Sequence, residues 1–528
     1  MGPHNCLAGE VGSEFFVSWM GSADQGEGGS GGTVEAAGSS SASMGRGPGY
    51  YSKQPLLPMT RSGSRNGLSS RQGGTLPGLM AGVSPLGAWI MVALLTVFVI
   101  LGVAMGSVGG GGAQGEEAYG IMIDAGSSGS RVHVYRFSVS GGGRPPVLLD
   151  EVFEQLKPGL SSYADTPQLS GASLKPLLDK ALETVPLGLR KSTPIALKAT
   201  AGLRMVEDPQ KILDDVRAFI STYPFQLSGG SAESAVTIID GAEEGAFGWM
   251  TVNYLLGHLG QPGDATVAIT DLGGGSTQIA FAKRAGAPAE ASPRRAGPGE
   301  QTVGIVGPDD VVVKFGGRNY ALHVHSYLGY GLISARKGIL SQGVADSSSP
   351  CLPLGFEHTF DNEDGEEVSV RGSGADATAF SRCTAVIEAD LMNKDFTVPI
   401  PDPAGCCDLG SGKGMELYAF SFFFDSARDS GLIGQKQYEG QLTPRMYKDA
   451  AEKACALDID GVSAAFPFMK PEFVPFLCLD LTYVHSLLTS GYKVGSTSPI
   501  SLAKKIAYNG IKAETSWTLG AVLATLEL

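Results

Sequence analysis

The chain has 528 residues, 43% of them hydrophobic, so it can bury the core of one or two large domains. Its formal net charge of −14 argues against nucleic acid as a partner and provides no long-range attraction for an anionic substrate. Any phosphate chemistry must therefore depend on local hydrogen-bond donors and a cation.

Residues 1–85 are rich in Gly, Ser, Arg and Pro and poor in large aliphatic side chains. Such a composition cannot bury enough apolar surface to fold, so we expect a disordered tail.

Residues 86–108 form an apolar run without a charged residue, long enough to cross a bilayer as a helix. A buried core helix and a cleaved signal segment, translated from a later methionine such as Met80, are the alternatives. Residues 109–112, all glycine, follow at once, which disfavours a core helix. The run therefore predicts a transmembrane signal anchor.

Basic residues precede this run and acidic residues follow it, at Glu116 and Glu117. The upstream basic residues, with no acid between them, are Arg46, Lys53, Arg61, Arg65 and Arg71. Because positive charge marks the cytoplasmic side, we expect a single-pass type II protein whose residues 116–528 form a lumenal or extracellular domain.

The first chemical motif, at 120–137, reads GIMIDAGSSGSRVHVYRF: an apolar strand, Asp124, a turn of glycines and serines, and a returning strand. A second stretch with the same pattern, AITDLGGGSTQIAF at 268–281, places Asp271 before three glycines. A single copy is also compatible with a glycine-rich hairpin without a ligand. Two copies form an internal repeat, and two such loops facing each other could supply donors to a polyphosphate from both sides.

Strand-like and helix-like runs alternate after Glu116, which favours an α/β architecture. We expect strands at 196–199, 236–239 and 311–315, helices at 209–223, 247–259 and 325–340, and polar loops at 284–310 and 361–377.

Two further segments could carry chemistry. KATAGLRMV at 198–206 places Thr200, Gly202 and Arg204 after a short strand, where either an ordinary turn or a phosphate contact is possible. DGAEEGAFGWMTVNYLL at 240–256 places Glu243 and Glu244 in the first turn of an expected amphipathic helix. Helix capping alone explains acids there, whereas a catalytic role needs a water to activate.

Six of the seven cysteines lie in the second half of the chain, which in an oxidising compartment predicts disulfides, although free buried thiols remain an alternative. They are Cys351, Cys383, Cys406, Cys407, Cys455 and Cys478; six cysteines permit about fifteen connectivities. There is no Asn-X-Ser/Thr site for a glycan, which argues slightly against a lumenal location.

These segments together resemble the apyrase, or nucleoside triphosphate diphosphohydrolase, family, which includes Golgi guanosine diphosphatases and plant-type apyrases. The similarity rests on IDAGSSGSRVHVYRF, KATAGLRMV, DGAEEGAFGWMTVNYLLG, TDLGGGSTQIAF and the late segments LYAFSFFFD and LCLDLTYVHSLLTSGY. VHSYLGYGL at 324–332 and SWTLGA at 516–521 extend it almost to the end.

The resemblance implies a two-lobed fold of the actin, heat-shock ATPase and sugar kinase type, with a nucleotide in a cleft between the lobes. It also implies the pairs Cys351–Cys383 and Cys455–Cys478. The segment 406–414 departs from plant-type members, so the pairing of Cys406 and Cys407 stays open.

The resemblance also implies roles for individual residues. Asp124 and Asp271 would hold water around Mg²⁺ or Ca²⁺, Glu244 would be the general base, and Ser276 and Gln278 would orient the attacking water. The residues implied to cradle phosphates are Ser127, Ser128, Gly129, Thr200, Gly273, Gly274 and Gly275. Phe423, Phe424 and Tyr492 are the implied contacts for the nucleobase, with Phe422 an alternative, although these phenylalanines could equally be core residues.

The chemistry fits these residue types. Because a transferred phosphoryl group passes through a loose transition state, the enzyme mainly aligns a water and neutralises charged oxygens. We therefore expect metal-dependent hydrolysis of nucleoside di- or triphosphates by direct attack of water.

Other functions remain open: an exopolyphosphatase or sugar kinase of the same fold, or a non-enzymatic nucleotide-binding protein. The EEG helix start and the late aromatic segments speak against the first two, and the water-positioning set would have no purpose in the third. With no second apolar span before Leu528, a Golgi membrane is favoured over the cell surface.

Overall fold

The computed structural model describes residues 115–141, 144–260, 266–283, 303–342, 348–361, 366–393 and 415–526. All belong to one compact unit, Leu94–Leu528. The tail predicted at 1–85, the membrane helix predicted at 86–108, and Cys406 and Cys407 lie outside the described residues. Within the described ranges, no helix combines the length and the hydropathy that a membrane span requires.

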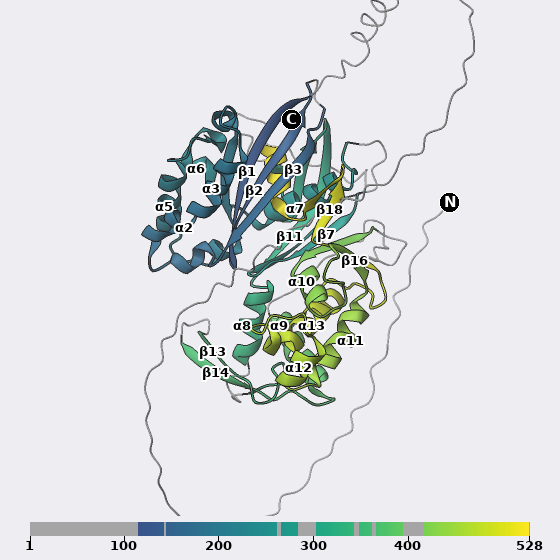
Figure 1. Ribbon diagram of the computed structural model, residues 1–528. Helices are drawn as coiled ribbons and strands as arrows, with labels where there is room; N and C mark the ends of the chain where they lie inside the picture. The colour runs from purple at the N-terminus through teal and green to yellow at the C-terminus, as the bar shows by residue number, and fades with distance from the viewer. Residues whose placement is uncertain are drawn as a thin grey trace, which may run out of the picture. The chain divides into compact units, whose positions relative to one another are not determined.

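The first of two large sheets has the strand order β3-β2-β1-β4-β5, with β6 also paired to β4 (Figure 1). Its strands are β1 (Glu116–Gly126), β2 (Gly129–Val139), β3 (Val147–Leu156), β4 (Pro194–Ala199), β5 (Gln226–Leu227) and β6 (Val236–Ile238). β1, β2 and β3 are antiparallel, whereas β4 runs parallel to β1. The hairpin predicted at 120–137 is therefore confirmed as β1–β2.

The second sheet has eight strands in the order β16-β17-β15-β7-β8-β11-β10-β9. They are β7 (Ala268–Leu272), β8 (Ser276–Ala282), β9 (Val303–Ile305), β10 (Asp310–Phe315), β11 (Arg318–Leu328), β15 (Leu417–Ser421), β16 (Glu439–Leu442) and β17 (Ile500–Ala503). β7 and β8 confirm the hairpin predicted at 268–281. Since β11-β8-β7-β15-β17 follows the same path as β3-β2-β1-β4-β5, the predicted repeat extends from the hairpins to the whole sheets.

Two smaller sheets complete the strands: β12 (Ser348–Ser349), β13 (Glu357–Asp361) and β14 (Glu367–Gly372) in one, and β18 (Lys505–Tyr508) and β19 (Ile511–Glu514) in the other. Two predicted loops need correction here. β9 lies within the loop predicted at 284–310, where its backbone pairs with β10. β14 lies within the loop predicted at 361–377, where it pairs with β13.

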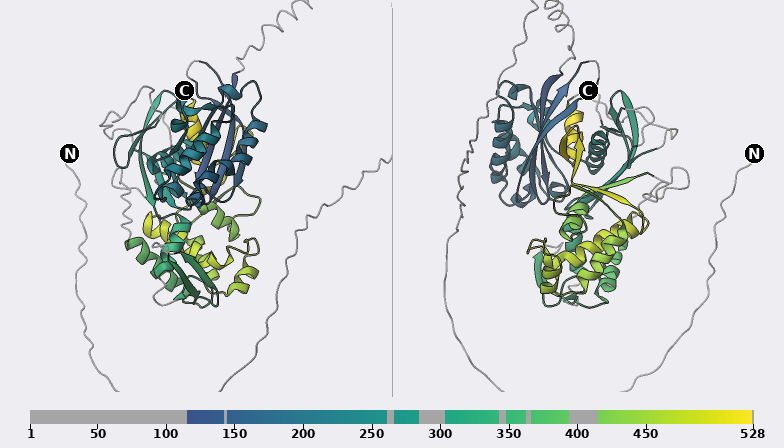
Figure 2. Two further views of the ribbon diagram at one scale, coloured as in Figure 1. Left: turned by 90° about the vertical axis from the view of Figure 1, so that its left-hand side faces the viewer. Right: turned by 45° about the vertical axis from the view of Figure 1, so that its right-hand side comes forward.

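Helices fill the space between the large sheets and cover their outer faces. α7 (Gly241–Leu255) and α14 (Trp517–Thr525) lie between the sheets, and one core cluster joins both helices to strands of both sheets (Figure 2, right). α3 (Lys175–Thr184) and α5 (Gln210–Ile220) pack on the other face of the first sheet. A third cluster joins the second sheet to α8 (Leu332–Gln342), α9 (Ala379–Asn393), α11 (Pro444–Cys455) and α13 (Leu477–Ser486). The shorter helices are α2 (Ser170–Ser173), α4 (Ala201–Arg204), α6 (Ala232–Ala235), α10 (Phe422–Asp429) and α12 (Ile459–Ala465).

The helix predicted at 325–340 is wrong in its first part. Residues up to Leu328 belong to β11, which pairs with β8 as far as the Leu328 and Ser276 positions. Gly329, with φ of 88°, ends the strand, and α8 begins only at Leu332. The apolar spacing of this stretch fits a helix, but strand pairing satisfies its backbone instead.

The helix at 240–256 forms as predicted but is not amphipathic. Every residue of α7 except Glu243 is buried, because the helix lies between two sheets. Asp240 caps it: its side chain accepts from the backbone N–H of Ala242 at 2.7 Å, and Glu243 completes a capping box.

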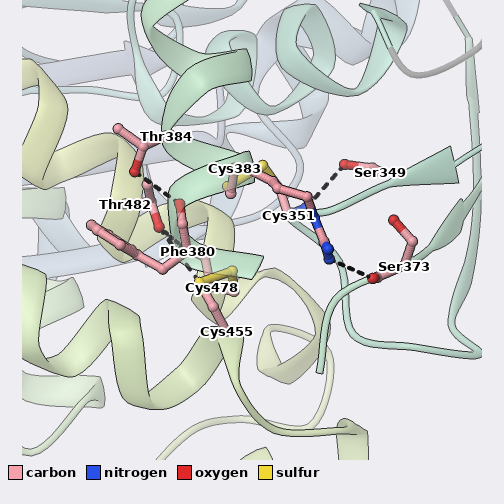
Figure 3. Close-up of a disulfide and its surroundings, with 10 residues drawn as sticks. Ser349, Cys351, Ser373, Phe380, Cys383, Thr384, Cys455, Cys478 and Thr482 are labelled. Carbon is pink, nitrogen blue, oxygen red and sulfur yellow. Dashed lines mark hydrogen bonds between the residues drawn. A yellow bond between two sulfur atoms is a disulfide. The ribbon is translucent and has the colours of Figure 1, made fainter. Parts of the chain in front are cut away.

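Two disulfides lie in the helical region beside the second sheet, Cys351–Cys383 and Cys455–Cys478 (Figure 3). The first ties the segment after β12 to α9, and the second ties α11 to α13. Thr482 lies against the second, with its hydroxyl donating to the Cys478 carbonyl at 2.7 Å. Both pairs that the resemblance implied are confirmed.

Candidate active site

The β1–β2 hairpin presents Asp124 at the end of its first strand and Ser127 and Ser128 in its turn. Arg131, directly across the ladder from Asp124, donates to its Oδ2 at 3.1 Å and to the Ser128 hydroxyl at 3.1 Å. Gly202 packs behind the turn, since a Cβ there would lie 2.8 Å from the Ser127 Cα. The turn is therefore packed from behind by Gly202, and Arg131 holds the Ser128 hydroxyl.

The β7–β8 hairpin brings Asp271 and the three glycines to the same place. A Cβ on Gly274 would lie 2.4 Å from the Ser127 hydroxyl oxygen, so the two predicted turns meet. A side chain at position 274 would require the Ser127 hydroxyl to move aside. The expectation that the two loops face each other is confirmed.

Glu244 lies in the first turn of α7 and is 8% exposed. Its Oε2 accepts from Arg204 Nη2 and, at 3.3 Å, from Gln278 Nε2. The same amide nitrogen donates to the Ser276 hydroxyl at 2.7 Å. A buried carboxylate, a hydroxyl and an amide thus form one hydrogen-bonded group, the arrangement needed to hold a water molecule in one orientation.

Two carboxyl groups of the site, Glu244 and Asp271, have raised pKa values. Burial raises the pKa of Glu244 to about 8; Arg204 opposes this shift, whereas the charges of Asp271 and Asp124 add to it. Burial also raises the pKa of Asp271 to about 6, against a hydrogen bond from Ser421 and with a contribution from Asp124. Negative charge therefore accumulates in a buried space, which favours binding of a cation.

The donor set fits a hydrated divalent cation better than a directly bound one. Among the described residues, no group of three or more His, Cys, Asp or Glu side chains could hold a metal ion. Asp124 Oδ1 and Asp271 Oδ1 are both buried and have no hydrogen-bond partner. Two free carboxylate oxygens suit the water shell of an ion such as Mg²⁺, which keeps several of its waters in protein sites.

A cavity connects these groups. Of the residues predicted from the sequence, it is lined by Asp124, Ser127, Ser128, Thr200, Glu244, Asp271, Gly273, Gly274, Gly275, Ser276 and Phe424. Gln278 is not part of the lining, but its Nε2 donates hydrogen bonds to two residues that are, Glu244 and Ser276. Gly129 begins β2 and is also not part of the lining.

Two of the three residues predicted for the nucleobase do not reach the cavity. Phe423 and Tyr492 are 0% exposed and belong to the core cluster beside the second sheet. The Tyr492 hydroxyl is 2.8 Å from the Thr277 hydroxyl, which fixes the ring inside. Phe422 and Phe424 line the cavity. Phe424 is only 1% exposed and belongs to the same core cluster, so the partly buried Phe422 is the more accessible of the two rings.

Several polar residues at the site were not assigned a role from the sequence, among them Arg131, Arg204 and His133. His133 lies two residues beyond Arg131 on β2, so both project from one face, and it lines the cavity. Its Nδ1 is 2.8 Å from Glu151 Oε1, while its Nε2 is buried without a partner. Period-two spacing along β2 is a signal that places Arg131 and His133 on one face of the strand.

Comparisons with known proteins show which family the chain resembles. Residues 112–528 match the model of the GDA1/CD39 (nucleoside phosphatase) family. Probable apyrase 1 of Oryza sativa subsp. japonica is 37% identical over 426 residues, which cover 78% of this chain and 82% of that protein. Ectonucleoside triphosphate diphosphohydrolase 6 of Homo sapiens is 37% identical over 430 residues, covering 78% of each.

The fold also has a solved counterpart. A crystal structure of nucleoside triphosphate hydrolases from Neospora caninum superimposes with a TM-score of 0.54 at 16% identity, covering 82% of this chain and 96% of that one. At this identity the likeness concerns the fold alone.

Proposed function

The chain belongs to the GDA1/CD39 (nucleoside phosphatase) family and is an enzyme of nucleoside phosphate hydrolysis; we propose that it releases the terminal phosphate of nucleoside di- or triphosphates by direct attack of water. The observation that carries this proposal is the cavity in which Glu244, Ser276 and the two glycine-rich turns meet. The phosphate chain lies between the two lobes, each built around one of the large sheets.

The turns supply the phosphate contacts. The hydroxyls of Ser127 and Ser128 and the backbone at Gly129 act from the first hairpin, and the amides of Gly274 and Gly275 act from the second. The Gly273 N–H donates to the Ser276 carbonyl at 3.0 Å, so Gly273 shapes the turn instead of offering its amide to phosphate. Thr200, at the end of β4, acts at the terminal phosphate. Such donors are fixed before the substrate arrives, so little reorganisation is needed when charge develops.

Asp124 and Asp271 would hold Mg²⁺ or Ca²⁺ through water. When bound there, the ion would supply positive charge to the phosphate oxygens. The two unpartnered carboxylate oxygens support this assignment.

Glu244 takes the proton of the attacking water. The water oxygen forms a bond to the terminal phosphorus, its proton passes to Glu244, and the bridging P–O bond breaks to release the shortened nucleotide. Ser276 and Gln278 restrict the orientation of the water. Arg204 pairs with Glu244, and its positive charge lowers the Glu244 pKa, which burial raises.

The nucleoside lies toward Phe424 and Phe422. Stacking on an aromatic ring discriminates weakly among bases, because every base has a π face. We therefore expect several nucleotides to be substrates.

Phosphate release tests the proposal. Purified protein is assayed with ADP, GDP, UDP, ATP and inorganic polyphosphate, each with Mg²⁺, with Ca²⁺ and with a chelator. Release from nucleotides that requires a divalent cation is expected. Folded protein that releases phosphate only from polyphosphate, or from no substrate, would overturn it.

For the location, we propose a type II protein of the Golgi membrane, supported by the apolar run at 86–108 and the basic residues before it. Protease digestion of sealed microsomes tests it, with a tag at each end of the chain. An N-terminal tag that is cleaved and a C-terminal tag that is protected are expected; the reverse pattern would contradict it.

A further inference from the structure

Behind the second glycine turn lies the segment that joins β11 to α8, residues 326–334, which we name the backing segment. Its backbone N–H groups bond to all three carbonyls of the turn. Gly329 donates to the Gly275 carbonyl at 2.8 Å, and Leu332 donates to the Gly273 carbonyl at 2.9 Å. Ile333 and Ser334 both donate to the Gly274 carbonyl at 3.0 Å.

These bonds determine which way the amides of the turn face. A trans peptide directs its C=O and its N–H to opposite sides. Since the carbonyls of Gly273, Gly274 and Gly275 point to the backing segment, the N–H groups of Gly274, Gly275 and Ser276 point away from it. In the described part of the chain, the N–H groups of Gly274 and Gly275 have no hydrogen-bond partner.

Gly331 is the closest point of this contact. A Cβ there would lie 2.4 Å from the Gly274 carbonyl carbon and from the backbone nitrogens of Gly275 and Ser276. These are backbone atoms, so no side chain can move aside. On the opposite side, the Ser127 hydroxyl lies next to Gly274. The turn is therefore held between Gly331 and the first hairpin.

The same segment reaches the water-holding group through Ser326. Ser326 on β11 stands directly opposite Gln278 on β8. Its hydroxyl accepts from Gln278 Nε2 at 3.0 Å, on the amide that also touches Glu244 and Ser276. Gly241, at the start of α7, lies against Ser326, since a Cβ there would be 2.3 Å from its hydroxyl oxygen.

We propose that the backing segment is a positioning element of the active site, with two separable effects. Gly331 sets how far the glycine turn extends into the cavity and so the distance from its amide groups to phosphate. Ser326 fixes the rotation of the Gln278 amide and so the orientation of the attacking water. Neither residue touches the substrate. The proposal rests on the proposed function, because it assigns these effects to that reaction.

The two effects predict different kinetic changes. Gly331→Ala forces the turn to shift, and a misplacement of about 1 Å can cost roughly 100-fold in rate. We expect its KM to rise at least tenfold. The binding analogue is a nucleoside diphosphate in which a methylene group replaces the bridging oxygen, and the Kd of Gly331→Ala for this analogue should rise by the same factor. Ser326→Ala loses one hydrogen bond, so kcat is expected to fall about 5- to 10-fold while that Kd stays unchanged.

Matched controls separate position from general stability. Gly188→Ala adds a methyl where no atom lies within 4 Å. Ser501→Ala removes a hydroxyl from the same sheet, where it bonds to the exposed Glu416 side chain at 2.7 Å. Both controls are expected to match the parent protein in kcat, KM and analogue binding.

A double-mutant cycle tests Ser326 most directly. If Ser326 acts through Gln278, the Ser326→Ala change has little further effect on kcat in a Gln278→Ala background. Losses that multiply would overturn the proposal, as would Ser326→Ala and Gly331→Ala variants with the kinetics of the controls. If Gly331→Ala fails to fold, the cycle decides alone. A parent protein that binds the analogue but releases no phosphate would instead refute the proposed function. In that case, the Kd of Gly331→Ala for the analogue would still show whether Gly331 positions the glycine turn.

Discussion

The two glycine-rich hairpins share a backbone plan but carry different residues opposite their aspartates. In the first, Asp124 faces Arg131 across the ladder; in the second, Asp271 faces Gln278. Arg131 brings positive charge to its aspartate and to the Ser128 hydroxyl. Gln278 brings a neutral amide to Glu244 and Ser276.

This difference separates the tasks of the two cross-strand residues: the turns of both hairpins contact phosphate, and only the second hairpin also orients the water. An arginine opposite the acid suits a hairpin that holds charged oxygens. An amide opposite the acid suits a hairpin that orients a neutral water, because it donates and accepts without adding charge. The comparison can be tested by removing each part in turn.

The largest effect is expected for Glu244→Gln, on the water side of the comparison. Loss of a general base typically lowers turnover about 10²- to 10⁴-fold, and KM should change little because Glu244 acts on the water. Steady-state phosphate release measures both constants. Glu243→Gln is the matched control: it keeps the capping bond to the Asp240 N–H, 3.3 Å long, and should retain nearly full turnover. Near-normal turnover of Glu244→Gln would show that another group is the base.

The next largest effect concerns the two aspartates. Asp124→Asn and Asp271→Asn should each lower activity about 100-fold at limiting Mg²⁺ or Ca²⁺, because a charge that holds the hydrated cation is lost. Activity is measured against cation concentration, and the half-saturating concentration should rise in both variants. An unchanged cation dependence in either variant would remove that aspartate from the proposed site.

Alanine substitution of the two cross-strand residues, Arg131 and Gln278, tests whether they have different tasks. Arg131→Ala should raise the KM for nucleotide about tenfold, whereas Gln278→Ala should lower kcat by a similar factor with KM nearly constant. Initial rates over a range of nucleotide concentrations give both constants. If both variants changed the same constant, the two hairpins would not differ in task.

The smallest effect is a shift in pH dependence. Glu244 must be ionised to accept a proton, and burial raises its pKa to about 8, so kcat/KM should rise with pH as Glu244 loses its proton. The charge of Asp271 helps to raise the pKa of Glu244, so Asp271→Asn should move the increase in kcat/KM to lower pH. A saturating cation should shift the profile in the same direction, and we expect each shift to be about one pH unit. Rate profiles from pH 5 to 9 measure it, and Glu243→Gln should keep the parent profile. A shift to higher pH would contradict the assignment.

The sequence was sufficient for the parts of the site that local chemistry determines. Acid-glycine patterns predicted both hairpins, and Glu243 with Glu244 marked the first turn of α7, because turn and capping residues act within a few positions. The pairs Arg131–Asp124 and Arg204–Glu244 were not predicted, since partner choice depends on how strands and helices pack.

The errors have the same origin. The pattern of 325–328 fits a helix, but pairing with β8 makes it a strand. Phe423 and Tyr492 match aromatic positions in the motif, but packing against the second sheet buries them completely. Burial depends on contacts distant in sequence, which no local pattern contains.

The enclosure of α7 between the two sheets has a consequence for hydrogen exchange. Apart from Glu243 its residues are buried, so its inner amides lack a local route to solvent and should exchange only when the whole domain unfolds. Glu244 is therefore mounted on one of the slowest-exchanging parts of the protein. Motion that admits substrate should therefore leave the helix that carries the proposed base folded.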